Sequence, residues 1–216
     1  KQIVPAQFFA SHLIANLASH GAEFWIAPGA RSQALAIAVA QLADAGVTKL
    51  RVRVDERSLG FSALGASANK RPQVLITTSG TAVANLHPAV LEAHHSGVPL
   101  ILLTADRPAE LRDKGANQTT NQVGIFSDAV IECIDVPAPT EDDIPNLPQL
   151  AKELVEKAVL LAWGERAQPV QLNLQFIEPL SSLTPNAAEI LESLEDADYK
   201  EQTALSQEVE STYIDL

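Results

Sequence analysis

Three charged residues in a row follow an alternating segment of the chain. The stretch VDERSLG, residues 54–60, places Asp55, Glu56 and Arg57 between the run KLRVRV and an apolar segment that contains glycine. Two carboxyl groups could act as an acid and a base, but adjacent residues at a strand end point to opposite sides, so a shared proton is not expected. From spacing alone, we expect Asp55 to cap the following helix and Glu56 to complement its dipole.

Two arginines begin other segments that could bind a ligand. Arg31 follows the letters APGA and precedes Ser32, and Arg107 follows Asp106. A guanidinium at such a position suits two-point binding of a carboxylate or phosphate. A structural ion pair is the alternative, with Asp106 or Glu110 as the partner of Arg107. The residues alone favour neither interpretation.

Other patterns indicate little chemistry. No Gly-x-Gly-x-x-Gly occurs, and the P-loop spacing of Gly60 and Gly65 is followed by Ala66 where a lysine is required. Of the five histidines, His87, His94 and His95 are expected on one helix, but no carboxylate or cysteine completes a metal site there, so surface or packing roles are expected. The single cysteine, Cys133, is expected to be a packed thiol. The sequence therefore predicts no metal ligand in this chain.

Short apolar runs alternate with segments of helical periodicity. Strands are expected over 23–27, 49–54, 73–79, 99–105, 130–136 and 169–175. Helices are expected over 6–20, 31–44, 57–69, 82–95, 147–162 and, as a short element, 121–127. Several strands are apolar on both faces, which is typical of a parallel sheet covered on both sides. The sequence therefore predicts a three-layer α/β fold, in which a sheet of about six mostly parallel strands has helices on both faces.

Ligands of such sheets bind at the carboxyl ends of the strands. Polar or glycine-containing segments follow each of the first four expected strands, namely PGARS, DERSLG, TSGTAVAN, and ADRP with the long loop that ends at Gln122. We expect these four segments to line one edge of the sheet and to form a single site.

Charge and hydropathy exclude some classes of protein. The net charge of -12 argues against nucleic-acid binding, which needs a basic surface. There is no apolar run long enough to span a membrane and no signal-peptide pattern, so a cytoplasmic protein without a membrane span is expected. Residues 187–216 contain nine acidic residues and one lysine. That stretch is expected to be helical or loosely ordered.

Four segments together resemble a known family. APGARS, VDERSLGFSALG, TTSGTAVANLHPAVLEA and LTADRPAELRDKGANQTTNQVGIF resemble the N-terminal pyrimidine-binding domain of thiamin diphosphate enzymes. ADRPAELRDKGANQ is similar, more narrowly, to menaquinone-pathway synthases that make 2-succinyl-5-enolpyruvyl-6-hydroxy-3-cyclohexene-1-carboxylate. We therefore expect a pyrimidine-binding domain over 1–180 and an acidic linker, or the start of a middle domain, over 181–216. Another thiamin enzyme, of the acetolactate synthase or oxo-acid decarboxylase type, and a non-catalytic α/β binding module are the alternatives.

The resemblance implies roles for particular residues. Glu56 would be the catalytic residue that hydrogen-bonds N1′ of the cofactor's aminopyrimidine, with Thr81 and Asn85 as its neighbours at the cofactor. Contacts with substrates or their adducts are implied for Arg31, Ser32, Arg107, Asn117 and Gln118. Ala30 stands where the family usually has Ser, so one hydroxyl contact is expected to be lost or supplied elsewhere.

The resemblance also implies a reaction and partners. The whole protein would be a transferase that decarboxylates 2-oxoglutarate and joins the succinyl portion to isochorismate, with thiamin diphosphate and Mg²⁺ as cofactors. The family's metal ligands lie in a Gly-Asp-Gly segment, and neither Gly-Asp nor Asp-Gly occurs in this sequence. We therefore expect the metal ligands outside this chain, an inactive chain when it is isolated, and a homodimer or homotetramer.

Overall fold

Six strands form one parallel sheet in the computed structural model, which describes residues 3–69 and 71–195. The strands are β1 (Glu23–Ala27), β2 (Leu50–Val52), β3 (Gln73–Thr77), β4 (Ile101–Asp106), β5 (Cys133–Val136) and β6 (Val170–Gln175). Their order across the sheet is β2-β1-β3-β4-β6-β5, and all neighbouring pairs are parallel. The predicted fold class is confirmed.

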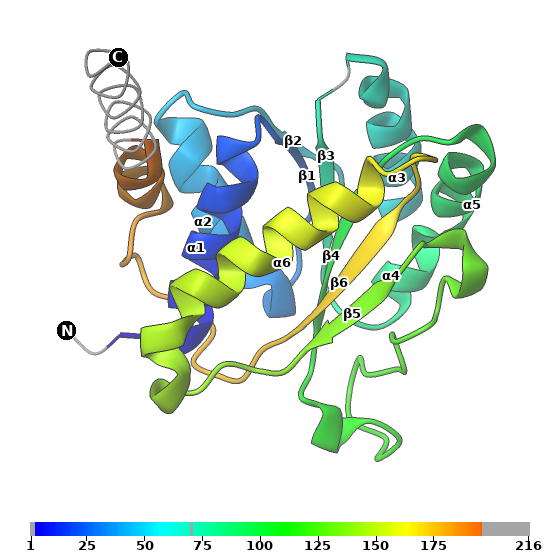
Figure 1. Ribbon diagram of the computed structural model, residues 1–216. Helices are drawn as coiled ribbons and strands as arrows, with labels where there is room; N and C mark the ends of the chain where they lie inside the picture. Colours follow the sequence, from blue (N-terminus) through cyan, green and yellow to red (C-terminus); the bar gives the residue numbers. More distant parts are fainter. Residues whose placement is uncertain (1–2, 70, 196–216) are drawn as a thin grey trace, which may run out of the picture.

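Helices cover both faces of this sheet (Figure 1). One face carries α1 (Pro5–Ser19), α2 (Gln33–Asp44) and α6 (Leu147–Ala162), and the other carries α3 (Glu56–Ala66), α4 (Thr81–Asn85) and α5 (His87–Ser96). Successive side chains of a strand point to opposite faces. In β1, Phe24 and Ile26 therefore join the core under α1, while Trp25 and Ala27 join the core under α3.

Pro88 divides one expected helix into two. The sequence predicts a continuous helix over 82–95, but α4 ends at Asn85 and α5 begins at His87. Proline has no N–H, and its ring clashes with the carbonyl four residues earlier, so a helix is interrupted just before it. Pro88 lies in the first turn of α5, where an N–H needs no helical partner.

The prediction of a short helix over 121–127 is wrong. Residues 123–126 form a turn, and a 3-10 turn, η4 (Ser127–Ala129), follows. Gly124 has a φ of 77°, in the left-handed region that an α-helix does not use. The expected strands 49–54 and 130–136 are shorter than predicted, because β2 and β5 are the edge strands and pair on one side only.

The chain after β6 packs against the helices of the α1 face. Residues 187–195 are helical, and Ala187 and Leu191 are buried in that core. The side chain of Gln41 on α2 donates to the carbonyl of Leu183 at 3.2 Å and accepts from the backbone N–H of Ala187 at 3.0 Å. The domain boundary at residue 180 stays a prediction, and the acidic residues beyond 195 lie outside the described part of the chain.

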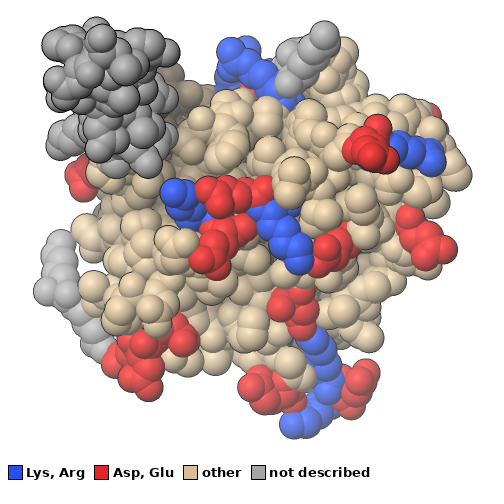
Figure 2. All heavy atoms as spheres, in the orientation of Figure 1, with Lys and Arg blue, Asp and Glu red and all other residues tan. Residues whose placement is uncertain are grey.

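The remaining regular elements are short 3-10 turns, and the surface charge is mixed. The turns are η1 (Ala30–Ser32), η2 (Ser67–Asn69), η3 (Ala109–Leu111) and η5 (Glu141–Asn146). Figure 2 shows acidic and basic side chains close together on the face over α6, where Lys157 pairs with Glu132 at 2.6 Å. Within the described ranges, every helix is too short or too polar to cross a bilayer.

Candidate functional site

Four loops meet at the carboxyl ends of four adjacent strands. In sheet order these strands are β2, β1, β3 and β4, and their loops carry Glu56, Arg31, Thr81 and Arg107 respectively. The chain leaves β1 for β2 on one side and later returns to β3 on the other. This is the switch point at which parallel α/β sheets bind ligands. The expectation of one shared edge is therefore confirmed.

Asp55 and Glu56 take different roles at the start of α3. Asp55 is the N-cap, and its carboxylate accepts hydrogen bonds from the hydroxyl and, at 2.7 Å, the backbone N–H of Ser58. These hydrogen bonds lower the pKa of Asp55. Glu56 is the first helical residue and is half-buried, and its Oε2 accepts a hydrogen bond from Nδ2 of Asn85 at 3.1 Å. The capping role of Asp55 is confirmed, and two of the predicted cofactor neighbours are in contact.

The turn that leads into α4 is held by the long loop after β4. The hydroxyl of Ser79 donates to the carbonyl of Gln118 at 2.8 Å, and the Gln118 amide donates back to the Ser79 carbonyl at 3.1 Å. Gly80 has a φ of 78°, and its N–H donates to Oε1 of Gln122 at 2.8 Å. Thr81 follows as an exposed residue at the start of α4. Gln118 therefore links the loop to the turn that carries Thr81.

Arg31 and Arg107 lie near one another at this edge. The guanidinium of Arg31 donates to the carbonyl of Phe176 at 3.0 Å and lies 3.5 Å from the carboxylate of Glu178. Burial lowers the pKa of Arg31 and the positive charge of Arg107 lowers it further, whereas Glu178 and Asp106 oppose the shift. The buried Nε of each arginine has no hydrogen-bond partner within residues 3–69 and 71–195. Two adjacent cations with unused donors are suited to binding an anion.

Two other predicted substrate residues have different surroundings. Ser32 is fully buried, and its hydroxyl donates to the carbonyl of Gly29 at 3.0 Å. Asn117 is exposed in the long loop, where its carbonyl accepts a hydrogen bond from the hydroxyl of Thr119 at 3.1 Å. The hydroxyl of Ser32 is thus directed at the backbone. Substrate contacts of both residues stay predictions.

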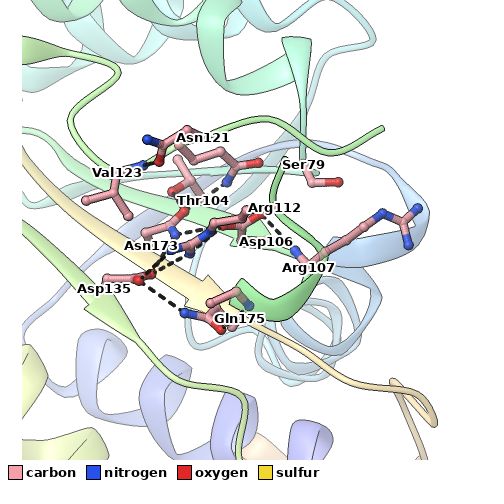
Figure 3. A network of polar contacts seen from close by, with 12 residues as sticks. Ser79, Thr104, Asp106, Arg107, Arg112, Asn121, Val123, Asp135, Asn173 and Gln175 are labelled. Atoms are coloured by element: carbon pink, nitrogen blue, oxygen red, sulfur yellow. Dashed lines mark hydrogen bonds and ion pairs between the residues drawn. The ribbon is translucent and has the colours of Figure 1, made fainter. Parts of the chain in front are cut away.

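A buried polar network, which sequence reasoning missed, fixes the long loop to the sheet (Figure 3). Its centre is Asn173 on β6. Oδ1 of Asn173 accepts from the hydroxyl of Thr104 at 3.0 Å and from the amide of Gln122 at 2.8 Å, and Nδ2 donates to Asp106 at 3.0 Å and to Asp135 at 2.8 Å. Every hydrogen-bonding position of this amide is therefore used.

The alternation in the segment QLNLQ was the signal for this network. Gln171, Asn173 and Gln175 occupy every second position of β6 and are all buried, so they share one face of a central strand. The amide of Gln171 donates to Thr104 at 2.9 Å. Polar side chains at every second position of an inner strand indicate a buried hydrogen-bonded layer, because buried polar groups need partners.

Arg112, from the loop after β4, supplies the positive charge of the network. It donates to both carboxylate oxygens of Asp135 at 3.0 Å each, and to Asp106 at 2.9 Å. The hydrogen bond with Asp135 raises the pKa of Arg112. Burial opposes ionisation of Asp135, but hydrogen bonds from Arg112, Asn173 and Gln175 outweigh it, so the pKa of Asp135 is lowered.

The alternative interpretation of Arg107 as an ion-pair partner of Asp106 or Glu110 is wrong. Asp106 accepts the backbone N–H of Arg107 at 2.8 Å, but its ion pair is with Arg112. In the part of the chain that the structure describes, no ion pair to the Arg107 guanidinium is found. Cys133 on β5 is half-buried, and burial raises the pKa of its thiol.

The geometry therefore defines a parallel α/β domain with a carboxyl group and two arginines at its switch point, and comparison with known proteins gives its family. Residues 9–125 match the family model described as "Thiamine pyrophosphate enzyme, N-terminal TPP binding domain". This match covers more than half of the 216 residues. The chain belongs to this family, whose cofactor is also called thiamin diphosphate.

Curated relatives narrow the resemblance. The chain is 51% identical over 185 residues to the 2-succinyl-5-enolpyruvyl-6-hydroxy-3-cyclohexene-1-carboxylate synthase of Leifsonia xyli subsp. xyli. The matched region is 84% of this chain and 31% of that relative. The chain is also 50% identical over 167 residues to the synthase of the same name from Chloroflexus aurantiacus. That matched region is 76% of this chain and 27% of the relative. The chain thus spans between a quarter and a third of the length of these curated relatives. The predicted resemblance to these synthases is confirmed.

Proposed function

We propose that this chain forms the aminopyrimidine-binding part of a synthase that makes 2-succinyl-5-enolpyruvyl-6-hydroxy-3-cyclohexene-1-carboxylate from 2-oxoglutarate and isochorismate. The supporting observation is the contact between Glu56 and Asn85, at the same sheet edge as Arg31 and Arg107. The names of the curated relatives support this particular reaction among those of thiamin diphosphate enzymes.

The carboxyl group of Glu56 fits the pyrimidine half of the cofactor. Its Oε2 accepts a hydrogen bond from Asn85, so Oε1 is the oxygen that could hold a proton at N1′ of the ring. Glu56 begins a helix whose N-cap is satisfied by Asp55, which fixes its position. When bound, thiamin diphosphate supplies a carbon nucleophile and an electron sink for the loss of carbon dioxide from a 2-oxo acid. Glu56 would share a proton with N1′ of the bound ring, giving it up to the ring and taking it back.

Arg31 and Arg107 are suited to the proposed substrates, because 2-oxoglutarate and isochorismate are both dicarboxylates. The carboxylate of Glu178, whose side chain is 74% exposed, lies 3.5 Å from Arg31. The Arg31 side chain is buried, but an ion pair whose carboxylate is exposed to water contributes little to stability. A substrate carboxylate could therefore replace Glu178 at Arg31 while a second carboxylate binds Arg107.

Binding of Mg²⁺ and of the diphosphate group is proposed to depend on residues outside this sequence. Across the described ranges, no group of three or more His, Cys, Asp or Glu side chains could hold a metal ion. A homodimer or homotetramer, and a cytoplasmic location, also stay predictions.

The test is Glu56→Gln in the full-length protein. A glutamine keeps the hydrogen bond with Asn85 but cannot exchange a proton with N1′, so turnover of 2-oxoglutarate and isochorismate should fall at least about a hundredfold. Thermal unfolding should change little, because the glutamine keeps the hydrogen bond with Asn85 and the lost charge at the start of α3 is worth only about 0.3–1 kcal/mol.

Glu92→Gln on α5 is the matched control. The Glu92 carboxylate accepts a hydrogen bond from Ser96 at 2.8 Å, away from the sheet edge, so this variant should retain full turnover. Unchanged turnover of Glu56→Gln would remove the proposed mechanism.

A further inference from the structure

Arg107 and Arg112 belong to one loop, but their side chains extend in different directions (Figure 3). The guanidinium of Arg112 lies between Asp106 and Asp135, whereas the side chain of Arg107 extends away from the network. The carboxylate of Asp106 therefore contacts the backbone N–H of Arg107 and the guanidinium of Arg112. This arrangement separates the two arginines by role.

The negative charges of Asp106 and Asp135 explain why Arg112 lies in the network and Arg107 does not. The side chain of Asp106 is 0% exposed and that of Asp135 is 29% exposed. Buried carboxylates without a cation are strongly destabilising, so a positive side chain has to lie beside them. Arg112 meets this need with hydrogen bonds of 2.9 to 3.0 Å. Arg107, which directly follows Asp106, would otherwise be the nearest cation in the sequence.

We infer that Arg112 is a positioning residue that neutralises Asp106 and Asp135 and thereby keeps Arg107 free to bind a carboxylate of the substrate. Without Arg112, the two carboxylates attract Arg107 into the network, and Arg31 alone faces the anion. The identity of the anion rests on the proposed function. The coupling of Arg112 to Arg107 rests only on the geometry.

A double-mutant cycle in the full-length protein tests this coupling. Four proteins are compared: wild type, Arg107→Met, Arg112→Met and the double variant. We expect Arg112→Met to raise KM for 2-oxoglutarate or isochorismate about ten- to a hundredfold, the loss expected for one charge-assisted contact. Adding Arg112→Met to Arg107→Met should change KM less than about threefold, because the effect of Arg112 passes through Arg107.

A merely structural role predicts the opposite result. If Arg112 only held the loop, its effect on KM would multiply with that of Arg107→Met, and this outcome would overturn the inference. Arg112→Lys restores one positive charge and should recover part of the lost affinity, which also provides a second variant if Arg112→Met does not fold. Arg166→Met is the matched control, because Arg166 is exposed and its guanidinium donates to the carbonyl of His94 at 3.1 Å, away from the network.

A crystal structure of the full-length Arg112→Met variant, or of Arg112→Lys, separates this inference from the proposed function. In Arg112→Met, the guanidinium of Arg107 should lie within about 4 Å of the carboxylate of Asp106 or Asp135, the usual limit for an ion pair. In Arg112→Lys, Arg107 should keep its wild-type direction. If Arg107 still points away from the network in Arg112→Met, the inference is wrong. If wild type does not turn over the two dicarboxylates, the proposed function fails while the structural result still decides the role of Arg112.

Discussion

Replacement of Asn173 by leucine should lower the free energy of unfolding more than a substitution at an exposed position does. The side chain of Asn173 is fully buried and makes four hydrogen bonds, two of them with the carboxylates of Asp106 and Asp135. Leucine has a similar shape but can form none of these bonds. The substitution therefore removes the centre of the network without opening a large cavity.

The magnitude follows from what the four partners retain. Bonds to charged groups are worth about 1.5–3 kcal/mol each and neutral ones about 1 kcal/mol. Each partner keeps another contact, for example Asp106 with Arg112 at 2.9 Å and Gln122 with the carbonyl of Ala105 at 3.3 Å. We therefore expect a loss of about 3–5 kcal/mol in the free energy of unfolding, below the full value of the four bonds.

Urea unfolding measures this loss, and hydrogen exchange locates it. Amide protection should fall in the loop from Arg107 to Gln122, because that loop is joined to β6 through Asn173. The control is Asn121→Leu, at an exposed asparagine whose side chain accepts one local hydrogen bond from Val123 at 3.2 Å. A loss below about 1 kcal/mol for Asn173→Leu, the value of one ordinary hydrogen bond, would refute the reasoning.

Two further predictions concern the sheet edge and pH. A Cβ on Gly29 would lie 2.4 Å from Cβ of Thr78, so Gly29→Ala should lower the free energy of unfolding by about 1–3 kcal/mol. A Cβ on Gly65 would meet nothing within 4 Å, so Gly65→Ala should instead raise it by up to about 1 kcal/mol by stabilising α3. Urea unfolding measures both changes. Because the pKa of Asp135 is lowered by folding, its charge stabilises the protein above the unfolded pKa of about 4, and this contribution is lost as the pH falls further. The difference in Tm between wild type and Asp135→Asn should therefore shrink below about pH 4, and a constant difference from neutral to acidic pH would contradict the assignment.

Most of the fold was predictable from the sequence. Strand and helix periodicities identify the parallel sheet and its two helical layers, because burial on both faces makes several of the inner strands apolar on both sides. The inner strand β6 is the exception, since it carries Gln171, Asn173 and Gln175 on one face. The break at Pro88 and the turn at Gly124 were missed, although both have local causes. Apolar periodicity continues through these residues, and periodicity was given more weight than backbone chemistry.

The sequence by itself determined which loops meet, whereas only the tertiary structure decided which charges pair. Polar segments after four strands predict a shared edge, because parallel strands bring their carboxyl ends together. The partner of Asp106 could not be chosen in this way, since Arg107 is its neighbour in the sequence and Arg112 its neighbour in space. Arg112 is directed there by Asp135, which lies 23 residues further along the chain. Asp135 comes close to Asp106 because β4 and β5 both pair with β6, where Asn173 donates to both carboxylates. Charge pairing depends on distance in three dimensions, and that distance is set by the order of strands in the sheet.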